Sequence, residues 1–353
     1  MSYLGPGSFK LWLQPSLRKR KRVETEETVD SDSEGESEAG SEGESEAGSE
    51  GESVDESQGE DEEMDDMFIV DVPPWIILGR RSHQDGTDWT CEDCQHFNRA
   101  SQHLFVNLPA FKCGRCDAKR RIDFRFSFGN LAANGLCPIG TILDQGNTDD
   151  CLVFALAKAA EITDRILSIL LGSPYVVPTL DPYSLKETYA RSRVAEGIKR
   201  RKINFQDEEA MERMMELMQT NGVQDLARNY TSRIGGFEEV SRNFEDISTE
   251  LAKGFPLVVD ILPGRSFYDL MYGEIYRCPY NDRTKPAGLT MAIHTVVLVG
   301  AARVGPDDYF YFLNSYGDKW CLRIERGTRK EIGGVGKLTA NDICNAPFKF
   351  WRM

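Results

Sequence analysis

The stretch from 143 to 172, LDQGNTDDCLVFALAKAAEITDRILSILLG, constrains the fold of this chain more than any other segment. It begins as a short polar loop and continues with apolar residues on most faces of a helical period, which is typical of a buried central helix. Asp149 or Asp150 is expected to cap this helix, and Gly172 is expected to end it. Cys151 then lies in the first turn, where unpaired N–H groups and the helix dipole favour a thiolate.

The acidic residues are concentrated near the start of the chain. Residues 24–66 hold 21 of the 57 Asp and Glu and no Lys or Arg, so the rest carries 42 − 36 = +6. The segment repeats GESEAGSE and has few apolar residues, so 1–66 are expected to be disordered. The basic run RKRKR at 18–22 predicts contact with a nuclear import receptor, with a solvated charge cluster as the alternative.

The sequence gives no sign of export or of a membrane span. The first residues lack the continuous apolar core of a secretory signal. No run of about 18 apolar residues is present either, so no membrane partner is expected. We therefore expect a protein of the nucleus, the cytoplasm or both, in which cysteines serve metal binding or catalysis rather than disulfides.

Two Cys-x-x-Cys pairs define a predicted zinc module over 67–120. They are Cys91 with Cys94 and Cys113 with Cys116, separated by 18 residues. Each turn directs two sulfurs at one point, and two such turns complete a tetrahedral Zn²⁺ site. We expect a structural zinc ion here and no cofactor for catalysis; the alternative is four unrelated buried cysteines.

The remaining residues, 121–353, have the pattern of one globular domain. Helical patterns come first, and the last hundred residues alternate like antiparallel strands. Helices followed by a sheet predict an α+β fold. The polar segment 181–204, with the basic cluster KRRK, is expected to be a surface loop.

Cys151 needs a base, and the histidines limit the choice. Three of the four lie in or beside the zinc module, which leaves His294 in the apolar strand IHTVVLVG. Such a histidine is commonly a core residue, yet a Cys at a helix start with one His in a strand is sufficient for a thiolate–imidazolium pair. Asn314 could orient the imidazole, and Gln145 with the backbone N–H of Cys151 could stabilise an oxyanion.

These segments resemble the papain-like cysteine peptidases. The similar segments are QGNTDDCLVFA, AIHTVVLVG and NSYGDKW, in the order Gln, Cys, His, Asn, within residues 121–353. The resemblance implies a two-lobed fold, with a helical lobe that carries the nucleophile helix and a lobe formed by an antiparallel sheet. It also implies Cys151 as nucleophile, His294 as acid and base, Asn314 as the orienting residue and Gln145 as oxyanion donor. By the same resemblance, Trp320 shields the His–Asn hydrogen bond.

The cysteine pairs, with Trp89 and Asn98, resemble the zinc finger of the Ran-binding-protein type. That resemblance implies binding of ubiquitin or single-stranded RNA, with Trp89 as a stacking face. A purely structural zinc clip is the alternative. The module precedes 121 where papain-like enzymes carry an inhibitory prosegment, and no such prosegment is visible.

Two functions remain open from the sequence. The first is an intracellular cysteine-type endopeptidase that hydrolyses protein or peptide substrates through an acyl-enzyme. The second is a catalytically weak or inactive papain-fold binding protein, whose finger binds ubiquitin or RNA. Asp149, Asp150 and Leu152 beside the nucleophile motivate the second, because two carboxylates disfavour a thiolate.

Overall fold

The computed structural model describes residues 70–71, 88–103, 106–132, 136–173, 177–205, 208–279, 293–324 and 331–352. The chain divides into two units, Met1–Glu63 and Met64–Met353, and every described residue belongs to the second. The predictions of a disordered segment at 1–66 and of an import signal at 18–22 concern residues outside these ranges.

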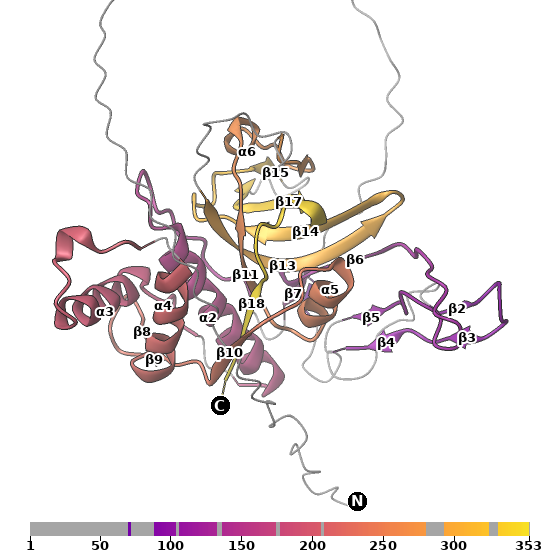
Figure 1. Cartoon of the computed structure of the whole chain (residues 1–353), viewed down its shortest axis with the longest axis horizontal. Coiled ribbons are helices and arrows are strands. Elements are labelled where there is room, and N and C mark those ends of the chain that lie inside the picture. The colour runs from indigo at the N-terminus through magenta and orange to yellow at the C-terminus, as the bar shows by residue number, and fades with distance from the viewer. Residues whose placement is uncertain are drawn as a thin grey trace, which may run out of the picture. The chain divides into compact units, whose positions relative to one another are not determined.

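A sheet of eight strands is the largest of the sheets in the described residues (Figure 1). Its order is β10-β18-β11-β13-β14-β17-β12, and β6 pairs with β13 off this path. Pairing is antiparallel except between β12 and β17. The strands are β6 (Phe124–Ser127), β10 (Gly236–Glu239), β11 (Leu257–Ile261), β12 (Ile275–Tyr276), β13 (His294–Val304), β14 (Asp307–Leu313), β17 (Val335–Thr339) and β18 (Phe348–Trp351).

Strand β13 organises the sheet because it is long and almost wholly buried. Ten of its eleven residues are buried, and only Val304 is partly exposed. Its first half pairs with β11, and its second half pairs with β6. The pairing with β14 shifts register between Leu298 and Gly300, and a Cβ at Gly300 would lie 2.3 Å from the carbonyl oxygen of Phe126. A glycine there lets the two backbones approach closely.

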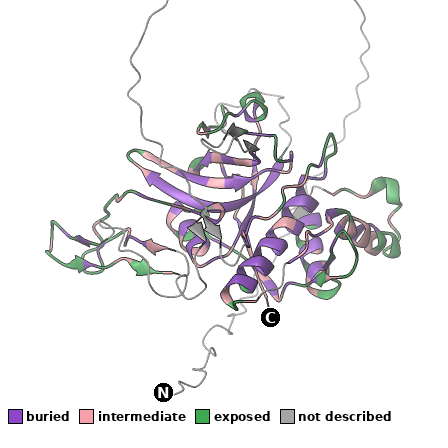
Figure 2. Cartoon of the chain, turned by 180° about the vertical axis from the view of Figure 1, so that it is seen from behind, coloured by how far each residue is buried: buried purple, intermediate pink, exposed green. Residues whose placement is uncertain are grey.

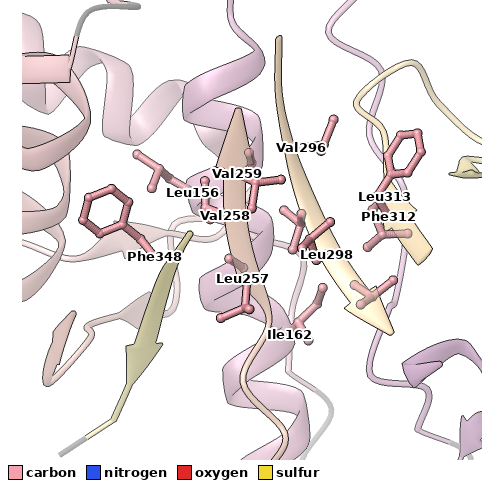
Figure 3. Packing of buried hydrophobic residues seen from close by; sticks show 14 of the residues in the cluster. Leu156, Ile162, Leu257, Val258, Val259, Val296, Leu298, Phe312, Leu313 and Phe348 are labelled. Atoms are coloured by element: carbon pink, nitrogen blue, oxygen red, sulfur yellow. The ribbon is translucent and has the colours of Figure 1, made fainter. Parts of the chain in front are cut away.

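The predicted central helix is α2 (Cys151–Leu170), and it begins and ends close to the expected residues. Gly172 follows at a φ of +61°, and its N–H donates to the carbonyl of Ile169. Most of α2 is buried, as Figure 2 shows in purple. In Figure 3, side chains from this helix meet those of β11, β13, β14 and β18, including Leu156, Ile162, Val258 and Leu298. This shared core fixes the first turn of α2 against the sheet.

Three further helices accompany α2: α3 (Pro182–Ala195), α4 (Glu208–Thr220) and α5 (Phe244–Ala252). The expectation of a surface loop over 181–204 is wrong, since α3 occupies most of that segment. Asp181 caps α3 by accepting a hydrogen bond from the N–H of Tyr183, and Leu185 and Tyr189 are buried. The helical period of apolar residues is weak in this part of the sequence, because only a narrow stripe of the polar helix α3 faces the core.

The remaining elements are short. They are β1 (Val70–Asp71), β2 (Trp89–Thr90), β3 (Phe97–Asn98), β4 (Ser101–Gln102), β5 (Asn107–Leu108), β7 (Leu131–Ala132), β8 (Val223–Gln224), β9 (Thr231–Ser232), α6 (Arg265–Tyr268), β15 (Arg323–Ile324), β16 (Glu331–Ile332) and three 3₁₀ turns at Phe128–Asn130, Arg200–Lys202 and Ala340–Asp342. The predicted α+β fold is confirmed. None of the described helices has the length and apolar content needed to span a membrane.

Candidate active site

Cys151 is the first residue of α2 and is buried, with 4% of its surface exposed. Asp150 precedes the helix, but its side chain makes no capping hydrogen bond, so the prediction of a cap from Asp150 is wrong. Its carboxylate instead accepts a hydrogen bond of 2.5 Å from Nζ of Lys186 on α3. This ion pair compensates one of the two carboxylates that were expected to oppose a thiolate.

His294 is the first residue of β13, and Asn314 directly follows β14. Nε2 of His294 lies 2.8 Å from Oδ1 of Asn314. That oxygen also accepts the backbone N–H of Ser315, which fixes the orientation of the amide. Because Oδ1 can only accept, Nε2 must carry the hydrogen, and Nδ1 of a neutral ring is left as the basic nitrogen.

The aromatic residue that covers this pair is Tyr316. Its ring stacks on His294 with centroids 5.2 Å apart and an angle of 27°. Trp320, which was expected to shield the hydrogen bond, packs against Phe267 and Tyr316, the two rings that contact His294. The ring of Phe267 contacts the imidazole from a second direction, with ring centroids 5.4 Å apart. The aromatic residue two positions after Asn314 was the available sequence signal for this role.

The pKa of the Cys151 thiol depends on Thr295, the residue that follows His294. Burial raises the pKa of the Cys151 thiol, whereas hydrogen bonds with the backbone and side chain of Thr295 act to lower it. The charge of Asp260 on β11 raises it further. The expected preference for a thiolate at the helix start is therefore outweighed by desolvation in this closed site.

Burial also acts on His294, and here too it favours the uncharged form. It lowers the pKa of His294, and the hydrogen bond with Asn314 offsets this only in part. A raised thiol pKa and a lowered imidazole pKa both favour the uncharged forms. Burial thus acts on both groups against the charged thiolate–imidazolium pair.

Gln145 is joined to the same site from the loop before α2. Its backbone N–H donates to the carbonyl of Ser315 at 2.8 Å, and its Oε1 accepts a hydrogen bond from Oγ of Ser315. Its Nε2 donates to the carbonyl of Thr148 at 2.5 Å. The structure thus brings together the loop of Gln145, the start of α2, the start of β13 and the end of β14. Thr295, Asp260 and Tyr316 at this centre were not predicted.

The four cysteines of the two Cys-x-x-Cys pairs gather at a second centre. Their ligand atoms all lie within 4.8 Å of one another. The sulfurs of Cys91 and Cys116 are 3.6 Å apart, and those of Cys94 and Cys113 are 3.5 Å apart. A tetrahedral site with Zn–S bonds of about 2.3 Å requires sulfurs roughly 3.8 Å apart, so this donor set fits Zn²⁺.

Trp89 and Asn98 support this cluster rather than present a surface. Asn98 is buried; its Oδ1 accepts the N–H of Gly114, so it joins the two knuckles. Trp89 is 6% exposed and donates from Nε1 to the carbonyl of Ala110. The expectation that Trp89 offers a stacking face is wrong, because its ring is buried and the guanidinium of Arg120 lies 5.6 Å from its centroid.

Comparison with known proteins identifies similar solved structures. No family model and no curated protein sequence matches the chain. A digestive procathepsin L2 proteinase from the Tenebrio molitor larval midgut is 16% identical, with 66% of this chain and 70% of that chain covered and a TM-score of 0.44. A structure from a study of the mite allergens Blo t 1 and Der p 1 is 18% identical, with coverages of 69% and 75% and a TM-score of 0.46. A Carica candamarcensis cysteine protease, CMS1MS2, in complex with E-64, is 17% identical, with coverages of 65% and 98% and a TM-score of 0.42. At such identities and scores, the activity of this chain has to be argued from its own site.

Proposed function

We propose that this protein is a cysteine-type endopeptidase of the papain-like kind, acting on protein or peptide substrates. The observation that carries the proposal is the hydrogen bond of 2.8 Å between Nε2 of His294 and Oδ1 of Asn314. It leaves Nδ1 of His294 as the base in a strand whose next residue, Thr295, contacts the sulfur of Cys151. A nucleophile, a base and an orienting group in this relation are what acyl transfer requires.

The proposed reaction begins from the neutral pair. Nδ1 of His294 takes the proton of the Cys151 thiol as the sulfur attacks the substrate carbonyl, and the resulting imidazolium gives that proton to the leaving amine. The amine departs and an acyl-enzyme remains, joined through a thioester. A water molecule, deprotonated by His294, then attacks the thioester carbonyl; the carboxylic acid leaves and Cys151 regains its proton.

The oxyanion of each tetrahedral intermediate needs two donors. The backbone N–H of Cys151, at the N-terminus of α2, is the first. Gln145 supplies the second. Its side-chain amide carries two N–H groups: one donates to the carbonyl of Thr148, and the other is the proposed donor to the oxyanion. Its connection to Ser315 holds the amide on the same side of the site as Asn314.

We also propose that Cys91, Cys94, Cys113 and Cys116 bind one structural Zn²⁺ ion. The distances between sulfurs and the joining role of Asn98 support this assignment. A structural site is favoured over a catalytic one because four thiolates fill the coordination shell. The metal takes no part in the proposed hydrolysis.

The test combines a mechanism-based probe with peptide hydrolysis. An epoxide inhibitor of cysteine peptidases should label the wild-type protein and not Cys151→Ala, and peptide cleavage should be lost in both Cys151→Ala and His294→Ala. Cys137→Ala and His103→Ala are matched controls outside the site, and both should retain labelling and cleavage. Labelling of His294→Ala at the wild-type rate would overturn the proposed pair.

One observation favours the second candidate function, a binding protein with little turnover. Burial raises the pKa of Cys151 and lowers that of His294, which opposes formation of the charged pair. In that case the finger carries the activity through ubiquitin or RNA. Peptide cleavage separates the two: absence of cleavage by the wild-type protein, together with zinc-dependent binding of ubiquitin or RNA, selects the binding protein.

A further inference from the structure

The basic cluster KRRK, at 199–202, follows α3 and takes no part in the proposed hydrolysis. Its last three residues form the 3₁₀ turn Arg200–Lys202. The backbone N–H of Lys202 donates to the carbonyl of Lys199 at 2.8 Å, and this hydrogen bond fixes the turn. Side chains three residues apart in a 3₁₀ turn lie on the same side, so Lys199 and Lys202 present their charges together.

Three of the four charges have no acidic partner in the part of the chain that the structure describes. Arg200 pairs with Glu187 on α3 at 2.6 Å. The side chains of Lys199, Arg201 and Lys202 form no ion pair or hydrogen bond with a described residue, and all three residues are exposed. Exposed charges of one sign attract anionic groups from about 8 Å away at physiological salt. The turn is therefore a surface for negative charge.

A series of contacts links this turn to the proposed nucleophile. Phe205 lies three residues after Lys202, and the ammonium of Lys186 is 5.0 Å from the centroid of its ring. The same ammonium pairs with Asp150, the residue before Cys151. An extended peptide advances about 3.3 Å per residue. A substrate that is attacked by Cys151 can therefore reach the cluster with residues only a few positions from the scissile bond.

The surroundings of the cluster favour an acidic peptide over a nucleic acid. Sites for single-stranded nucleic acid combine basic groups with aromatic faces on which bases stack. The ring of Phe205 is half-buried, Lys186 covers one of its faces, and Tyr189 packs against it with ring centroids 5.6 Å apart. This ring is therefore used inside the fold and does not serve as a stacking platform.

We propose that Lys199, Arg201 and Lys202 bind acidic side chains of the substrate, a few positions from the scissile bond and on one side of it, so that acidic protein segments are the preferred substrates. This inference rests on the proposed peptidase function. The cluster lies away from the reacting atoms, so it stabilises the bound substrate and the transition state equally. Acidic substrates therefore have a lower KM and nearly the same kcat.

Peptides that carry a block of glutamates at increasing distances from the cleaved bond test this selectivity, with glutamine blocks as the uncharged reference. At one range of distances the glutamate peptides should have a KM about fivefold lower, as expected for several exposed ion pairs. The triple variant Lys199→Gln/Arg201→Gln/Lys202→Gln should remove this difference and leave kcat unchanged. About 1 M salt should remove it in the wild type, because the charges are screened within about 3 Å.

The matched control is Arg99→Gln/Arg115→Gln/Lys119→Gln in the zinc module. These residues are also exposed and form no ion pair with a described residue, so the control loses the same net charge elsewhere. It should keep the preference for glutamate peptides, and melting curves of both triple variants exclude loss of folding. Equal KM values for glutamate and glutamine peptides in the wild type overturn the proposal. A preference that survives in the turn variant, or that falls equally in the control, also overturns it.

A binding measurement does not depend on turnover. Fluorescence anisotropy gives the Kd of labelled glutamate and glutamine peptides for Cys151→Ala, alone and combined with each triple variant. The Kd of the glutamate peptide should rise several-fold with the turn variant and stay constant with the control. A turn variant that loses binding of a single-stranded RNA oligonucleotide but keeps its Kd for the glutamate peptide overturns the proposal in favour of a nucleic-acid surface. If no peptide is cleaved, the peptidase proposal fails and this Kd decides alone: a rise supports the surface for acidic peptides, and no change overturns it.

Discussion

Tyr316 stacks on the imidazole of His294, with ring centroids 5.2 Å apart and an interplanar angle of 27°. Tyr268 extends the stack, since its ring lies 6.1 Å from Tyr316 at 17°. Tyr268 is 54% exposed whereas His294 is 4% exposed. Tyr316 therefore separates the His294–Asn314 hydrogen bond from solvent, and three predictions concern this centre.

The first prediction concerns removal of this cover. Tyr316→Ala should expose His294 to water, and because burial is the cause that lowers the pKa of His294, that pKa should rise toward its ordinary value. The acid limb of the kcat/KM profile should move to higher pH, and kcat/KM should fall about tenfold. Tyr316→Phe keeps the ring, so it should retain the wild-type acid limb. An unshifted limb in Tyr316→Ala would show that the ring does not control hydration of His294.

The second prediction concerns the orienting residue. Asn314→Ala removes the acceptor for Nε2 of His294, so the ring loses its fixed tautomer and orientation. The value of kcat should fall about 10²-fold with little change in KM, because the lost interaction positions the base and does not hold the substrate. A kcat that stays at the wild-type value in Asn314→Ala would contradict the orienting role.

The third prediction concerns the ion pair at the start of α2. Lys186→Met leaves the buried carboxylate of Asp150 without this partner and should lower the free energy of unfolding by about 2–3 kcal/mol, at the low end for a buried pair because Lys186 is 30% exposed. The uncompensated charge should also raise the pKa of Cys151, which a later onset of alkylation with pH would reveal.

The matched control for this pair uses Glu187, the residue after Lys186 on α3. Arg200→Met breaks the ion pair of Arg200 with Glu187, in which both side chains are exposed, and should cost much less stability than Lys186→Met. The double variant Asp150→Asn/Lys186→Met should recover much of the stability lost in Lys186→Met. Urea unfolding curves compare the four proteins, and equal losses for the two single variants would contradict a special role for the buried pair.

The sequence was sufficient to predict the main elements that carry the site. The apolar pattern after Cys151 predicted α2, and the alternation around His294 predicted β13, because both signals are local and strong. Pairing across the sheet is not local: the position of Asp260 opposite Thr295 depends on the register of β11 against β13. The single acidic residue in PLVVDIL was visible, but no local rule shows which side chain an acid will face.

The charge balance at the nucleophile could not be predicted for a related reason. Asp150 precedes Cys151 in the chain, and its effect was expected to be large. The structure shows that Lys186, 36 residues further on, compensates it. A partner at that sequence distance requires the packing of α3 against α2, which depends on buried side chains of both helices. Closeness in the sequence therefore overstated the effect of Asp150 on Cys151, and it did not indicate the effect of Asp260.

The last prediction concerns the cysteine cluster and its attachment. Phe111 lies beside the second knuckle and packs on Phe124 at 5.8 Å, and the guanidinium of Arg303 on β13 lies 5.2 Å from its ring. Cys113→Ser should therefore release the proposed zinc ion and also loosen this contact, because folding of the knuckle and metal binding are coupled.

The metal content is measured directly. Elemental analysis should find about one zinc per wild-type chain and much less in Cys113→Ser, whereas Cys137→Ser, outside the cluster, should keep its zinc. The melting temperature should fall in Cys113→Ser. Phe111→Ala should also lower it while leaving the zinc content unchanged, because truncation of this partly buried phenylalanine removes packing and no ligand. A Cys113→Ser protein that retains its metal would refute the assignment of the four cysteines. A Phe111→Ala protein as stable as the wild type would show that the contact of Phe111 with Phe124 and Arg303 does not help to hold the finger on the sheet.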